Sequence, residues 1–220
     1  MMGLNIDKFK KYLVSAESDR VHWNKGEDGF TTPCGVYSVA NKNAEVVDKI
    51  KREMVKYGLN YNNRSDVLYF DKTLSKSFRE ELCDMATRYE LQKYIKLPEE
   101  LIDIFDENTL LVYFSISVNA GNKRANKLLQ EHFGAYPDGI IGKRTIEAIV
   151  LDYMELVQKF GEGSGRESFN RALQYAMISE MIDFYHKLAT QDRYKRYLRG
   201  WLNRMRNLAR VVGVEYAWIK

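Results

Sequence analysis

The chain contains few cysteines and histidines and no long apolar run. Its two cysteines, Cys34 and Cys83, are too few for a disulfide framework and fit a reducing compartment. No stretch is long and apolar enough to cross a bilayer, and the segment MMGLNIDKFKKY lacks the apolar centre of a secretory signal. We therefore expect a protein that is made in the cytoplasm and does not insert stably into a membrane.

The three histidines, His22, His132 and His186, are far apart in the sequence and stand in no HExxH or CxxC context. We therefore expect no zinc site, and nothing in the sequence calls for another metal or a cofactor. With 220 residues, of which 45% are hydrophobic, the chain can form one large domain or two small ones.

Positive charge is in slight excess and gathers near the C-terminus. The net charge is +4, and the run RYKRYLRGWLNRMRNLAR, which begins at Arg193, contains no acidic residue. Such a helix could bind an anionic polymer, whether cell wall, membrane surface or nucleic acid, or could simply be solvated. Because no nucleic-acid-binding motif accompanies the run, we do not expect nucleic acid as a partner.

Helical periodicity covers most of the chain. The apolar spacing predicts helices over 5–16, 43–56, 71–94 (one or two), 98–105, 122–133, 146–157, 167–189 and 191–211. The run TLLVYFSISVNAG, which ends at Gly121, predicts a buried central helix, with a strand as the alternative. The stretch HWNKGEDGFTTPCGVYSV indicates a loop and a small hairpin, NYNNRSD a surface loop, and GEGSG (161–165) a linker. The fold class is α+β, mostly α.

Glu17 is the first candidate for catalysis. It closes the first expected helix at the edge of its apolar stripe, which consists of Ile6, Phe9, Leu13 and Ala16. Apolar neighbours and the negative end of the helix dipole both disfavour an ionised carboxylate. A glycosidase requires this of its general acid, which must hold a proton near neutral pH. The alternative from the residues alone is a solvated glutamate at a helix end.

The order Glu17, Glu27, Thr32 and Gly35, with the later stretch SVNAGNKRANKLLQEHFGAYPDGIIGKRTIEAI, resembles the N-acetylmuramidases of glycoside hydrolase family 108. The segment from Tyr185 to Arg204 resembles the closing helix pair of their C-terminal peptidoglycan-binding domain. The chain departs from the family at Glu17-Ser18-Asp19, where the family has Glu-Gly-Gly. It also has Glu27 in place of Asp, one residue farther along, so that either Glu27 or Asp28 is the second carboxylate.

The resemblance implies a lysozyme-like catalytic domain with a small β-hairpin over residues 1–119 and a helical peptidoglycan-binding domain over 120–220. The implied reaction is hydrolysis of the β-1,4 bond between N-acetylmuramic acid and N-acetylglucosamine. Glu17 would protonate the leaving oxygen, while Glu27 with Thr32 would hold the attacking water in an inverting route. If the carboxylates lie close together, a retaining route is open instead.

Further residues are candidates for substrate binding. The aromatic side chains of Trp23, Phe30 and Tyr37 either pack against sugar faces or belong to the core. In the turn DGIIGKRT, Asp138 and Lys143 either contact the cell wall or belong to a well-made turn between helices.

Two rival hypotheses remain. Cys34 could serve a wall peptidase or amidase with His132 or His186 as the base, or the protein could be a non-catalytic wall-binding or secretion-assisting protein. The favoured hypothesis is a monomeric phage or prophage endolysin whose partner is the peptidoglycan glycan strand. It would act in the periplasm or at the cell wall after release through a holin-like pore or an export system.

Overall fold

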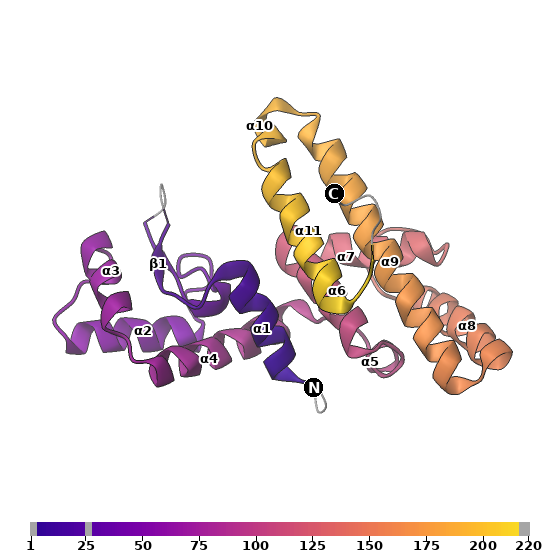
Figure 1. Cartoon of the computed structure of the whole chain (residues 1–220), viewed down its shortest axis with the longest axis horizontal. Coiled ribbons are helices and arrows are strands. Elements are labelled where there is room, and N and C mark those ends of the chain that lie inside the picture. The colour runs from indigo at the N-terminus through magenta and orange to yellow at the C-terminus, as the bar shows by residue number, and fades with distance from the viewer. Residues whose placement is uncertain (1–3, 25–27, 216–220) are drawn as a thin grey trace. The chain divides into compact units, whose positions relative to one another are not determined.

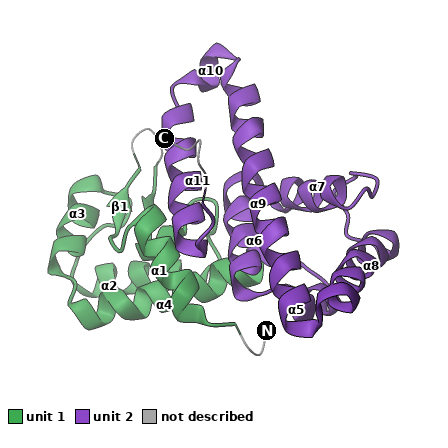
Figure 2. Cartoon of the chain, turned by 45° about the vertical axis from the view of Figure 1, so that its right-hand side comes forward, with its two compact units in different colours: residues 1–93 green, residues 94–220 purple. Residues whose placement is uncertain are grey.

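The computed structural model describes residues 4–24 and 28–215, and most of these are helical (Figure 1). The chain forms two compact units, residues 1–93 and 94–220 (Figure 2). The boundary between these compact units lies between Lys93 and Tyr94, whereas the sequence analysis expected domains that meet at residues 119 and 120. The reason is that helix α6 (Glu107–Ala120) packs against the later helices α7, α9 and α11. No helix in the described segments has the length and apolar character needed to span a membrane.

Unit 1 combines helices with one small antiparallel sheet, as the α+β prediction required. Its elements are α1 (Ile6–Glu17), β1 (His22–Trp23), β2 (Phe30–Thr31), the 3-10 helix η1 (Pro33–Gly35), α2 (Glu45–Lys56), α3 (Arg64–Thr73) and α4 (Lys76–Tyr94). In the sheet, Trp23 lies opposite Phe30. The amphipathic helix α1 buries Phe9, Tyr12 and Leu13. This burial fixes the orientation of the helix and thereby the position of its last residue, Glu17.

Helix α3 begins inside the polar stretch that was predicted as a surface loop. The side-chain oxygen of Asn63 accepts hydrogen bonds from the backbone N–H groups of Ser65 (2.9 Å) and Asp66 (3.2 Å). These bonds satisfy two of the amide groups that a helix start leaves without an intrahelical partner. The same asparagine-rich composition that indicates a turn can therefore cap a helix.

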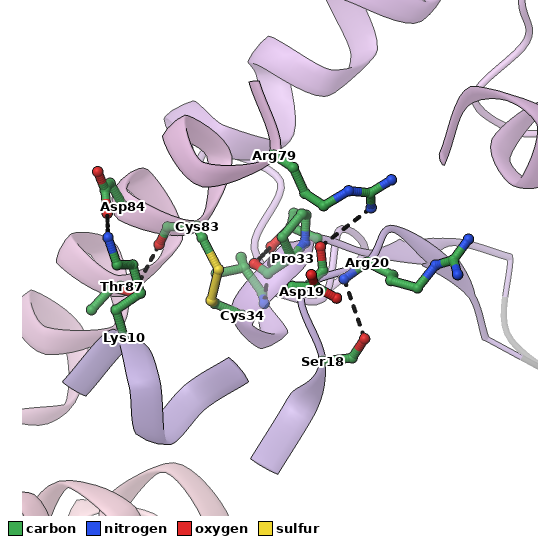
Figure 3. Close-up of a disulfide and its surroundings, with 12 residues drawn as sticks. Lys10, Ser18, Asp19, Arg20, Pro33, Cys34, Arg79, Cys83, Asp84 and Thr87 are labelled. Atoms are coloured by element: carbon green, nitrogen blue, oxygen red, sulfur yellow. Dashed lines mark hydrogen bonds and ion pairs between the residues drawn. A yellow bond between two sulfur atoms is a disulfide. The ribbon is translucent and has the colours of Figure 1, made fainter. Parts of the chain in front are cut away.

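Cys34 and Cys83 form a disulfide, with their Cα atoms 5.4 Å apart (Figure 3). The expectation of two reduced cysteines is wrong. The bond joins η1 to α4, and the two residues are separated by 49 positions in the sequence. Such a pairing depends on how α4 packs, so the number and spacing of the cysteines did not reveal it.

Unit 2 is entirely helical within its described part. Its elements are α5 (Glu99–Ile104), α6 (Glu107–Ala120), α7 (Asn122–His132), α8 (Lys143–Phe160), α9 (Glu162–Ala189), α10 (Asp192–Lys195) and α11 (Leu198–Val212). The apolar run is a helix and not a strand: α6 buries every residue from Thr109 to Ser117. The carboxylate of Asp106 caps it by accepting a hydrogen bond from Thr109 N at 2.7 Å.

The segment GEGSG is not a linker. Gly161 ends α8 with φ +79°, and α9 begins at the next residue. A Cβ atom on Gly165 would lie only 2.6 Å from the backbone of Leu156 and Val157. Gly165 therefore permits a close crossing of α8 and α9, which composition alone does not distinguish from a flexible connection.

Candidate active site

Glu17 stands at the only described place where non-glycine residues adopt positive φ values. Ser18, directly after Glu17, has φ +89° and ψ 156°, and Cys34 has φ +61°. The backbone N–H of Cys34 donates to the carbonyl oxygen of Ser18 at 2.9 Å, so the two strained residues hold each other (Figure 3). Backbone strain of this kind costs about 1–3 kcal/mol per residue and gathers at functional sites. Ser18 also occupies the position where the resembled motif has glycine, and it keeps a conformation that glycine favours.

Gly35 lies directly against Glu17. A Cβ atom at position 35 would be 2.9 Å from Cγ of Glu17, and Gly35 has φ +99°. Two residues of the motif, Glu17 and Gly35, are therefore brought into contact by the Ser18–Cys34 hydrogen bond and by the disulfide behind it. The half-buried Glu17 side chain has little room to move on this side.

A buried carboxylate, Asp71 of α3, anchors the chain that follows Glu17. Asp71 accepts hydrogen bonds from Arg20 (2.6 Å), from Arg79 (2.5 Å) and from the backbone N–H of Val21 (2.9 Å). Burial alone would raise the pKa of Asp71, but these hydrogen bonds outweigh burial and lower it. Asp71 therefore stays ionised and fixes the path of residues 19–21, a role that sequence reasoning did not assign.

Glu90 of α4 is a second acidic group next to Glu17 that the sequence analysis missed. Its side chain is buried, and burial raises its pKa to about 7, although Lys93 opposes the rise and the negative charge of Glu17 adds to it. The signal was present in the sequence. Glu90 falls four residues after Ala86 on the apolar face of α4, and a carboxylate in such a stripe is uncommon.

Of the two candidates for the second carboxylate of the expected mechanism, the structure describes one. Glu27 lies outside the described residues, and Asp28 is exposed at the start of the return to β2. The Thr32 side chain is fully buried, with its hydroxyl donating to Pro33 O (2.9 Å) and accepting from Val36 N (3.2 Å). The Thr32 hydroxyl thus shapes the η1 turn, and its expected role in holding water stays a prediction.

The three aromatic candidates differ in exposure. Phe30 is 1% exposed and belongs to the core, whereas Trp23 and Tyr37 are half-buried. A pocket of about 310 Å³ also lies in this unit, lined by Lys10, Lys11, Val14, Asp19, Lys76, Arg79, Glu80 and Cys83. Glu17 is not among its lining residues, so we do not assign the glycan to this pocket.

The disulfide also bears on the peptidase hypothesis. A cysteine nucleophile attacks as a thiolate, and the Cys34 sulfur is instead bonded to Cys83. Cys34 is moreover fully buried. In this state the chain offers no thiol for peptide hydrolysis.

In unit 2 the turn around Asp138 is held from within. Gln130 donates to Asp138 Oδ1 (2.8 Å) and to the carbonyl oxygen of Ile140 (3.0 Å), and it accepts from Gly139 N (2.7 Å). The Gln130 bond, followed by one from the Ile140 amide, lowers the pKa of Asp138. Lys143 begins α8, and its side chain is 88% exposed. Asp138 therefore serves the turn itself, while Lys143 points into solvent.

One comparison with known proteins identifies this part of the chain. Residues 124–206 match a family model described as a predicted peptidoglycan domain. The match supports a peptidoglycan-associated protein, with peptidoglycan as its partner. Searches against curated proteins and against solved structures gave no match.

Proposed function

We propose that unit 1 is an N-acetylmuramidase that acts on the polymer bound by unit 2, with Glu17 as the general acid. The observation that supports this most is the pair of strained residues, Ser18 and Cys34, which place Gly35 against Glu17. Glu17 and Gly35, two residues of the motif that resembles family 108, are thus in contact.

In this mechanism Glu17 donates its proton to the glycosidic oxygen while positive charge develops on the departing sugar. The second carboxylate, Glu27 or Asp28, acts on the opposite face of the ring. A separation of about 6.5–9.5 Å between the two carboxyl groups gives inversion, and one of about 5–5.5 Å gives retention. The buried Glu90 lies close enough to Glu17 for the negative charge of Glu17 to add to the rise of its pKa.

The place of action follows from the substrate and the disulfide. Disulfides persist mainly outside the reducing cytoplasm. Peptidoglycan also lies outside the cytoplasm. The Cys34–Cys83 bond supports an enzyme that works in the periplasm or at the cell wall. Release through a holin-like pore or an export system, and an endolysin role, are part of the same proposal.

The test is the chemistry of the fragments that the protein releases from purified peptidoglycan. Mass spectrometry of wild-type digests should show new reducing N-acetylmuramic acid ends, and Glu17→Gln should release far fewer of them in the same time. Anhydro ends would indicate a lytic transglycosylase, and free stem peptides an amidase or peptidase. If the wild-type protein binds peptidoglycan and releases no fragments, the non-catalytic, secretion-assisting function replaces the muramidase.

A further inference from the structure

Unit 2 contains a pocket of about 410 Å³ between α7 and α9. Arginine, lysine, acidic and aromatic side chains line it: Arg124, Glu131, Glu180, Asp183, Phe184 and Lys187. All of these residues lie within the segment that matches the peptidoglycan domain. None of them belongs to the Asp138 turn.

Two polar atoms of the lining are buried without a hydrogen-bond partner in the described part of the chain, namely Nε of Arg124 and Oε2 of Glu180. The Arg124 guanidinium is held in place by other contacts, 4.5 Å from the centre of the Phe184 ring and 3.8 Å from the Glu131 carboxylate. Buried polar atoms in native proteins almost always have a partner, and the exceptions call for a water, an ion or a ligand. The lining residues Arg124 and Glu180 thus each have one buried polar atom, a donor and an acceptor, that the described residues leave without a partner.

The charges of the lining are mixed. Glu131, Glu180 and Asp183 supply carboxylates, and Arg124 and Lys187 supply cations. Burial raises the pKa of Glu180, Glu131 adds to the rise, and Arg124 opposes it. A ligand ammonium beside Glu180 would offset the mutual repulsion of these carboxylates, while a ligand carboxylate would suit Arg124 and Lys187.

We infer that this pocket binds a group that carries both an ammonium and a carboxylate, such as the diamino acid of a peptidoglycan stem peptide. The ammonium lies at Glu180 and Asp183, the carboxylate at Arg124 and Lys187, and the carbon chain between them packs on Phe184. The inference rests on the peptidoglycan partnership of unit 2 and does not require unit 1 to be an enzyme.

The test uses the full chain and a soluble disaccharide-tripeptide that ends in diaminopimelic acid, with binding measured by calorimetry. Glu180→Gln keeps the size of the side chain and removes its charge, and Arg124→Gln removes the cation. We expect each to weaken binding at least tenfold. Arg144→Gln and Glu155→Gln, which change exposed charges on α8, are the matched controls and should bind like wild type.

Two further ligands identify what is recognised. The same compound with its side-chain amine acetylated, and the disaccharide without peptide, should both bind at least tenfold more weakly. Equal binding of the peptide-free disaccharide would overturn the inference in favour of a sugar site, and wild-type affinity in the Glu180 and Arg124 variants would exclude the pocket. Asp183→Asn and Lys187→Gln change two lining residues whose side chains lie at the surface. A loss of binding in these two variants is therefore not explained by a folding defect. Release of fragments from whole peptidoglycan is scored separately, so failure here leaves the muramidase proposal testable.

Discussion

The two units are stabilised by different means. Unit 1 depends on long-range polar and covalent links around Glu17: the Cys34–Cys83 disulfide, the buried Asp71 cluster and two strained backbone residues. Unit 2 depends on helix packing, with α6 buried on all sides and α8 and α9 crossing at Gly165. Strain held by cross-links is typical of a catalytic site, and regular packing suits a rigid binding surface.

The largest expected effect is on the covalent link in unit 1. For the double variant Cys34→Ala, Cys83→Ala we expect a loss of about 4 kcal/mol in the unfolding free energy of unit 1, because the unfolded chain regains the freedom of a long loop. Peptide-resolved hydrogen exchange should show faster exchange in α1 and α4 and unchanged exchange in α6 and α9. If hydrogen exchange became faster by the same factor in both units, the disulfide would not be a stabilising feature of unit 1 in particular.

The next effect concerns Glu90. The pKa of Glu90 is raised to about 7 in the folded state, with burial as the main cause. Between about pH 4.5 and pH 7, the folded protein therefore keeps a proton on Glu90 that the unfolded chain has released. Stability should therefore fall between pH 4.5 and 7, by about 3 kcal/mol from this group alone, and stay level above. The groups acting on it are Lys93 of the same helix and Glu17 of α1.

Denaturant titrations at pH 4.5 and pH 8 measure this effect. Glu90→Gln should match wild type at pH 4.5 and exceed its stability at pH 8. If the two proteins have the same pH dependence, Glu90 is not the group that titrates.

In unit 2, Gly165→Ala should cost about 2 kcal/mol, because the added methyl group would meet the backbone of α8 and force the helices apart. Gly163→Ala is the matched control. A Cβ atom there meets nothing within 4 Å, so alanine should be neutral or stabilise by up to about 1 kcal/mol. Thermal unfolding of both variants measures the difference, and equal Tm values would argue against the close crossing.

The smallest effect is at Ser18. Ser18→Gly should stabilise unit 1 by about 1 kcal/mol, because glycine adopts φ +89° without strain. Ser15→Gly, inside α1, should instead destabilise it by about 0.5 kcal/mol. The two changes are chemically identical, so loss of stability in both would show that Ser18 is not strained.

The comparison of the units also explains what the sequence could predict. Local periodicity predicted most helices of unit 2, the apolar run of α6 predicted a buried helix with a strand as the alternative, and Glu17 and Gly35 were found through a motif. The disulfide, Asp71 and Glu90 depend on packing between residues far apart in the chain, which periodicity does not contain. Composition misled at Asn63 and at Gly165, where residues typical of loops cap a helix or permit a close crossing.

The most direct test of the account is the rate at which Glu17→Gln digests purified peptidoglycan, measured together with its binding to the same insoluble material. We expect the rate to fall on the order of 10²- to 10⁴-fold, because the amide cannot donate the proton, and binding to stay at the wild-type level. Glu45→Gln, an exposed carboxylate on α2, is the matched control and should digest normally. Digestion by Glu17→Gln within a factor of a few of wild type would contradict the central claim.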